Sequence, residues 1–124
     1  MYFGCSGAPD VCAALRSAVS NAFEKSGLRS VNAAARADIA IGATAEVLQQ
    51  KVDSQFGTTF ATRTYSIELT GEAPRVGDDV AMPGAATVSF DPSVGRERLD
   101  EKARVIASDI VDRVRAYVKK KRGQ

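Results

Sequence analysis

The sequence contains no histidine and no tryptophan, and it has two cysteines, Cys5 and Cys12. Without histidine the chain lacks the side chain that titrates near neutral pH and the commonest metal ligand. Ser-His-Asp and Cys-His catalysis are therefore excluded, together with zinc sites that need histidine. Two cysteines are also too few for a four-cysteine zinc site. We therefore expect no enzyme, no metal and no cofactor.

A long apolar run and a large charge excess are missing as well. No stretch of about 18 apolar residues, the length that spans a membrane, occurs in the chain. The 17 Lys and Arg nearly balance the 15 Asp and Glu, and a net charge of +2 does not indicate a nucleic-acid or membrane-surface partner. The chain begins directly on strand-like residues, with no basic and apolar leader. We expect Met1 to begin a trimmed chain.

The remaining composition is that of a globular protein. The 124 residues are 44% hydrophobic and 26% charged, which suits one folded domain over residues 1–124.

Two amphipathic helices are predicted from apolar residues at steps of three and four. The first begins at Pro9 and Asp10 and ends before Gly27, a residue suited to a left-handed cap. The second runs to about Arg122, with acidic residues near its start and basic residues at its end, as the helix dipole favours. Its apolar stripe consists of Leu99, Ala103, Ile106, Ile110, Val114 and Tyr117.

Alternation of apolar and polar residues predicts four strands, at 2–5, 38–48, 61–70 and 85–90. The polar stretch 49–59 is predicted to be a long turn or loop, and 71–84 a connection. The order is therefore β-α-β-β-β-α. We expect an α+β two-layer sandwich, with a mostly antiparallel sheet of about four strands and two helices on one face.

Cys5 and Cys12 lie seven residues apart, at the junction of the first strand and the first helix. A disulfide here would pin the strand end to the first turn of the helix and would contribute about 2.5 kcal/mol by chain entropy. Two free buried thiols and a lipidated Cys5 are the alternatives, whereas the spacing of a redox motif is absent. A disulfide would favour an exported protein.

Two surfaces are candidates for binding a partner. Phe56, Thr58, Thr59 and Phe60 form a strip of aromatics and hydroxyls that could make a binding edge. The basic run Lys119, Lys120, Lys121 and Arg122 could contact phosphates or anionic lipid.

The acidic residues suggest no metal site or catalytic pair. Asp78, Asp79 and Asp91 lack the spacing of a calcium loop, and neighbouring aspartates point different ways. Glu46 and Glu68 fall on the polar faces of their strands, where we expect surface charges rather than an acid–base pair.

The element order and the segment Ala37-Asp38-Ile39-Ala40-Ile41-Gly42 resemble a group of bacterial envelope domains. The group comprises the TolB amino-terminal domain, the curli-secretion lipoprotein CsgG and the lipoprotein activators of penicillin-binding proteins. This chain departs from the pattern in its long linker 71–84 and its short opening strand. The resemblance implies a periplasmic or outer-membrane-associated module that binds proteins, is often lipid-anchored, and has no shared catalytic residues.

We therefore predict a non-catalytic envelope domain for protein–protein interaction, within a lipoprotein or an assembly or secretion accessory factor. Its partner would be a protein, including further copies of itself, bound at an exposed strand edge or the loop 56–60. Nucleic acid is not expected, and membrane contact would come only through a lipid anchor. The alternative is a small cytosolic nucleic-acid-binding module that uses the basic end of the last helix.

Overall fold

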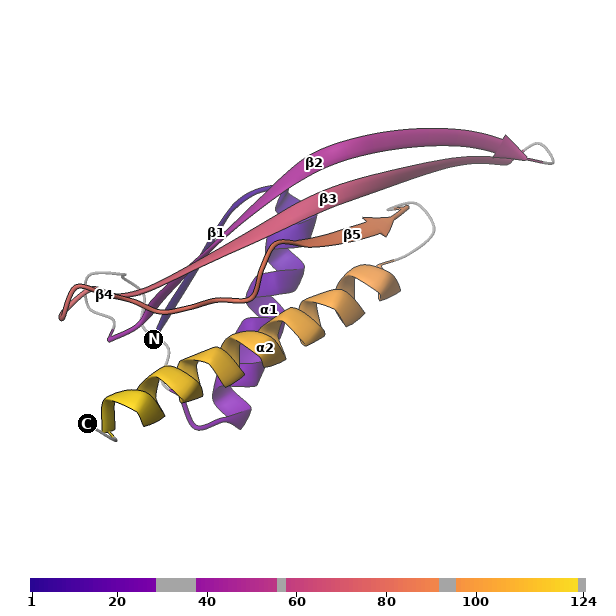
Figure 1. The fold of residues 1–124 in the computed structure, drawn as a ribbon. Coiled ribbons are helices and arrows are strands. Elements are labelled where there is room, and N and C mark those ends of the chain that lie inside the picture. Colours follow the sequence, from indigo (N-terminus) through magenta and orange to yellow (C-terminus); the bar gives the residue numbers. More distant parts are fainter. Residues whose placement is uncertain (29–37, 56–57, 92–95, 123–124) are drawn as a thin grey trace.

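The computed structural model describes residues 1–28, 38–55, 58–91 and 96–122. The elements in chain order are β1 (Tyr2–Gly7), α1 (Pro9–Lys25), β2 (Ala40–Gln55), β3 (Thr58–Ala73), β4 (Asp78–Asp79), β5 (Ala86–Phe90) and α2 (Glu97–Arg122). Both helices cover the same face of one sheet (Figure 1). The predicted α+β two-layer fold is confirmed.

The sheet is built around the long hairpin of β2 and β3, which pair antiparallel along their lengths. β1 pairs with β2 in parallel, because the chain returns through α1 before it enters β2. The short strands β4 and β5 both pair with β3, β4 at its last two residues and β5 along its middle, from Arg63 to Ile67. The hairpin is therefore the only pair of strands, among the described residues, that runs the whole length of the sheet.

The core lies between the sheet and the two helices. Along β2, Ile41, Ala43 and Ala45 are buried, whereas the alternating Thr44 and Glu46 are exposed on the other face. The largest side chains that are almost fully buried are Phe23, Leu15, Ile41, Ile67, Leu99, Ile110, Val11, Val19 and Val114. The helical stripes predicted from the sequence thus face the sheet.

The end of α1 follows the predicted cap. Gly27 has a φ of 72°, its N–H donates to the Glu24 carbonyl at 3.2 Å, and the Leu28 N–H donates to the Phe23 carbonyl at 2.8 Å. This is a Schellman motif, in which a glycine takes the left-handed conformation and the last carbonyls of the helix are satisfied.

The prediction of a loop over 49–59 is wrong. β2 continues to Gln55 and β3 begins at Thr58, so the polar stretch is the end of the hairpin. Gln49, Gln50, Lys51 and Val52 are all exposed, so this part of the strand has no buried face to create an alternating pattern. The expected connection 71–84 also includes the end of β3 and the two residues of β4.

Candidate interaction surface

The far end of the β2–β3 hairpin extends beyond the other strands and the helices (Figure 1). β1 pairs with β2 only as far as Ala45, and β5 pairs with β3 only from Arg63 to Ile67. The pairs from Lys51–Thr62 to Gln55–Thr58 continue past both limits. We call residues 46–55 and 58–62 the hairpin arm.

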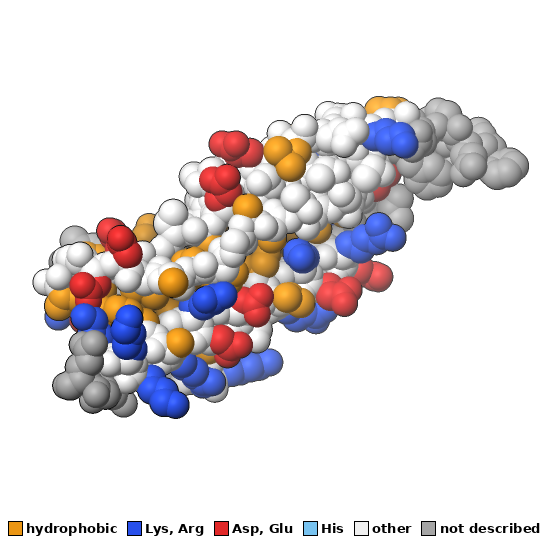
Figure 2. Space-filling model, viewed as in Figure 1, with side chains coloured by type: hydrophobic (Ala, Val, Ile, Leu, Met, Phe, Trp, Pro, Cys, Tyr) orange, Lys and Arg blue, Asp and Glu red, His pale blue; other side chains and the backbone are white. Residues whose placement is uncertain are grey.

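Exposed apolar side chains concentrate on this arm. Val47, Leu48 and Val52 are 53%, 61% and 59% exposed, and they are three of the five large hydrophobic side chains exposed among the described residues. In Figure 2, the described part of the arm is mostly uncharged, with separate hydrophobic side chains, whereas charges of both signs are mixed along α2. An apolar surface on a projecting, weakly charged element is typical of a protein-binding site.

A β-bulge interrupts the arm where it leaves the body of the sheet. The pairing shifts by one residue between Val47 and Gln49, so that Leu48 has no partner on β3. A bulge of this kind re-aims the following side chains and increases the local twist. Val52 consequently shares a face with Ala61, whereas Leu48 lies where the strand changes register.

The two edges of the arm differ. On the β3 side, β5 covers the strand to Arg63, and the Asp91 carboxylate then accepts the Ala61 N–H at 3.0 Å. On the β2 side, no described strand pairs with the chain beyond Ala45. The β2 edge of the arm is therefore the one that lacks a neighbouring strand within the described ranges.

Gly7 ends the cover that β1 gives to β2. Its φ is 104°, and a Cβ built on it would overlap the Ala45 carbonyl oxygen. The N–H of the next residue, Ala8, donates to the same Ala45 oxygen at 2.9 Å. Glycine therefore allows the chain to turn away from β2 at this point and enter α1.

A disulfide joins Cys5 on β1 to Cys12 in α1, with 5.5 Å between the Cα atoms. Cys12 is 3% exposed, and the Arg16 guanidinium donates to the Cys5 carbonyl at 2.9 Å. Cys5 thus occupies the position expected for a strand end pinned to a helix, and its sulfur is engaged in this bond. The bond ties β1, two residues before its end, to the start of α1.

The other predicted binding residues are placed as follows. Phe56 lies outside the described residues. Thr58, Thr59 and Phe60 begin β3, within the arm, although their side chains fall outside the described part. These three residues lie on the same hairpin arm as Val47, Leu48 and Val52 of β2, which were not predicted from the sequence to be a binding surface.

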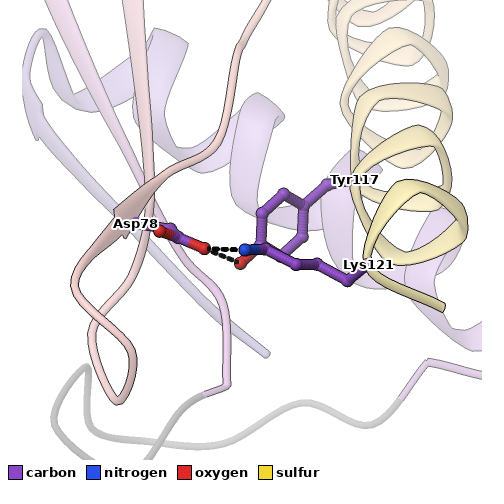
Figure 3. A network of polar contacts seen from close by, with 3 residues as sticks. All are labelled: Asp78, Tyr117 and Lys121. Carbon is purple, nitrogen blue, oxygen red and sulfur yellow. Dashed lines mark hydrogen bonds and ion pairs between the residues drawn. The ribbon is translucent and has the colours of Figure 1, made fainter. Parts of the chain in front are cut away.

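The basic run at the end of α2 is partly engaged with the sheet. Lys121 Nζ lies 2.6 Å from Asp78 Oδ2, and the Tyr117 hydroxyl donates to the same oxygen at 3.0 Å (Figure 3). Lys121 also lies 5.9 Å from the centre of the Tyr117 ring. Lys119 and Lys120 are exposed, and the side chain of Arg122 lies outside the described part.

These contacts shift the ionisation of all three groups. The hydrogen bonds from Lys121 and Tyr117 lower the pKa of Asp78 below its ordinary value. The hydrogen bond to Asp78 raises the pKa of Lys121. Desolvation, followed by the hydrogen bond to Asp78, raises the pKa of Tyr117. The network favours the carboxylate, the ammonium and the neutral phenol together.

The remaining acidic residues do not converge on a metal. Asp78 is directed to α2, whereas its neighbour Asp79 pairs with Glu72 across the strands, and Asp91 binds the Ala61 N–H. Within the described ranges no group of three potential ligands is close enough to hold a metal ion. Glu46 and Glu68 are diagonal neighbours, because Glu46 pairs with Ser66 and Thr44 pairs with Glu68, and both are exposed.

A hollow of about 470 Å³ lies between the two helices. Its lining combines small side chains of α1 with Asn21, Asp100 and Arg104 and with Arg96, which also donates to the Asp10 carbonyl at 3.3 Å. The polar groups there carry both charges and do not point to one ligand.

None of the described helices is both long and apolar enough to cross a membrane. No protein-family model matches the chain, and no curated protein matches it in sequence.

Solved structures with a similar chain path do exist. CT253, a hypothetical protein from Chlamydia trachomatis, is 12% identical with a TM-score of 0.50, over 94% of this chain and 96% of that chain. The lipoprotein GNA1162 from Neisseria meningitidis is 11% identical with a TM-score of 0.48, over 93% of this chain and 98% of that chain. A minor lipoprotein from Acinetobacter baumannii is 12% identical with a TM-score of 0.38, over 98% of this chain and 94% of that chain. The likeness to CT253 shows a shared fold.

Proposed function

We propose that this chain is a non-catalytic domain of an exported envelope protein, and that it binds another protein through the hairpin arm. The observation that carries the proposal is the projection of the arm, with Val47, Leu48 and Val52 exposed on it. Exposed apolar area costs free energy in water, at roughly 25 cal/mol per Å², and a partner that covers it recovers this cost.

The exported compartment is supported by the Cys5–Cys12 disulfide. Disulfides form and persist in the periplasm and outside the cell, and they are rare in the reducing cytosol. The envelope group that the segment around Asp38 resembles points in the same direction. Membership of that group stays a prediction.

The test is a comparison of two photo-crosslinking positions in cells that make the protein. A photoreactive residue at Val52 should give a discrete crosslinked species with another protein. The same residue at Val105, which is 50% exposed on α2, is the matched control and should not. Equal crosslinking at both positions, or none at Val52, would show that the arm is not the binding surface.

The alternative, a cytosolic nucleic-acid-binding module, would depend on the basic run. Lys121 is already paired with Asp78, so the run offers fewer free charges than its sequence suggests. Binding of a single-stranded RNA that weakens with salt, and is lost when Lys119 and Lys120 are changed to Gln, would favour this alternative.

A further inference from the structure

The backbone groups on the arm can be assigned to one edge or the other from three observations. Strand residues direct their N–H and C=O alternately to the two sides. Ala61 donates its N–H to Asp91, on the side away from β2. Its cross-strand neighbour Val52 therefore directs its own backbone groups away from β3, to the open edge. The same alternation places the backbone groups of Gln50 at that edge and those of Lys51 toward Thr62.

The same conclusion follows from the other end of β2. The Ala45 carbonyl points to the β1 side, since it accepts the Ala8 N–H. Along β2 the backbone groups point alternately to the β1 side and to the β3 side, and the extra residue Leu48 shifts this alternation by one. The backbone groups of Gln50 and Val52 therefore point to the same edge with which β1 pairs between Ala40 and Ala45. The open half of β2 is thus a direct continuation of an edge that already holds one strand.

From this geometry we infer that the β2 edge of the arm takes up an extended segment of a partner protein as an added strand. The inference rests on the proposed function and specifies its mode of binding. The partner segment would hydrogen-bond through its backbone to Gln50 and Val52, along the line of β1. It would carry apolar side chains at alternate positions, because Val52 is 59% exposed beside the edge.

A partner segment suits this edge better than a second copy of the same edge. The bulge at Leu48 twists β2, and Lys51 is exposed on it. Bulges and lysines are devices by which natural edge strands resist pairing with an identical edge. A short segment from another protein can follow the local twist, since it is not held in a sheet of its own.

The inference predicts an alternating pattern of amide hydrogen exchange. The probe is an N-acetylated octapeptide of alternating threonine and valine with a lysine at each end. Exchange at Gln50 and Val52 should slow by about tenfold or more when the peptide is bound, whereas Lys51, already paired with β3, should change little. The same peptide with N-methylated valines lacks the donors and is the matched control.

Three outcomes would overturn strand addition. They are no slowing at Gln50 and Val52, equal slowing by the N-methylated peptide, and slow exchange at both positions before any peptide is added. A dimer of the isolated protein that Gln50→Pro dissociates would identify a second copy as the occupant, and would also contradict the inference.

A second experiment separates this inference from the proposed function. Gln50→Pro removes the outward N–H without removing a β2–β3 hydrogen bond, and Gln50→Ala keeps that N–H. The crosslink from Val52 should be lost in Gln50→Pro and kept in Gln50→Ala. A crosslink that persists in both would retain the arm as the binding surface and exclude strand addition. A crosslink absent from the unmodified protein would instead remove the proposed function.

Discussion

Gly7 decides where the first strand stops. Two independent constraints act on it, a positive φ and a backbone oxygen in the space that a side chain would fill. Gly77 has a similar positive φ of 70°, but a Cβ there would meet nothing within 4 Å. A substitution at Gly77 therefore measures the free-energy cost of backbone strain alone, whereas a substitution at Gly7 adds the cost of a steric clash.

We expect Gly7→Ala to destabilise the protein far more than Gly77→Ala. Gly77→Ala should cost about 1 kcal/mol of unfolding free energy, from the left-handed conformation alone. Gly7→Ala should cost about 3 kcal/mol or more, because the Ala45 carbonyl must also move. Urea denaturation of the two variants would measure both values, and equal losses would contradict the geometry at Gly7.

The disulfide gives a second prediction for single residues. Cys5→Ala with Cys12→Ala should lower the free energy of unfolding by about 2.5 kcal/mol, since the bond closes a short loop in the unfolded chain. Reductant should lower the melting temperature of the natural protein and leave that of the double variant unchanged. Reduction of a disulfide adds two hydrogens to the mass of the protein. If the mass does not change on reduction, the cysteines are not paired.

Among the elements, the hairpin arm carries the most specific prediction. Lys51→Pro should loosen the arm, because the Lys51 N–H faces Thr62 on β3, whereas Gln50→Pro should not. Amide exchange of the β3 residues between Thr62 and Thr64 would report the difference. Lys51→Ala is the control for loss of the side chain. Equal loosening by the two prolines would contradict the assignment of edges.

The arm also shows what the sequence could not reveal. Strands are recognised by one more buried and one more exposed face, and residues 41–46 and 65–70 follow that pattern. From Val47 to Val52 every side chain is exposed, and the bulge at Leu48 changes the parity of the following residues. A strand that is stabilised only by pairing with its neighbour resembles a polar loop in sequence. The candidate strip at Thr58–Phe60 was found from its composition, and its neighbours on β2 were not.

At the scale of the whole molecule, the contacts of Asp78 join the end of the sheet to the last turns of α2. Asp78 is separated from Tyr117 by 39 residues in the chain, and no local pattern indicates the contact. The helices, the strand order and the two layers follow from periodicity, whereas this link depends on the final placement of both layers.

The network predicts how stability varies with pH. Because the folded pKa of Asp78 is lowered, its contribution is present above the ordinary aspartate value of about 3.9 and is lost as pH falls through the folded value. The pKa values of Lys121 and Tyr117 are raised. Their contributions are present below their ordinary values and are lost as pH rises through the folded ones.

Asp78→Asn should therefore destabilise the protein at neutral pH, and its difference from the natural protein should shrink in strong acid. Thermal unfolding of both proteins between about pH 2 and pH 7 would measure this convergence. Asp79→Asn is the control, since Asp79 lies on the other side of β4 and faces Glu72. A difference that stays constant with pH would contradict the network.

The parallel pairing of β1 with β2 also constrains the order of folding. The β2–β3 hairpin joins residues close in sequence, whereas β1 must find β2 across α1 and the segment that follows it. Local contacts form faster than distant ones, so the hairpin is expected to exist before β1 docks. During that interval the edge of β2 is bare from Ala40 onward, and it can template aggregation. The turn at Gly7 and the bond between Cys5 and Cys12 hold β1 against this edge. They thus also shorten the time during which the newly made chain is prone to aggregate.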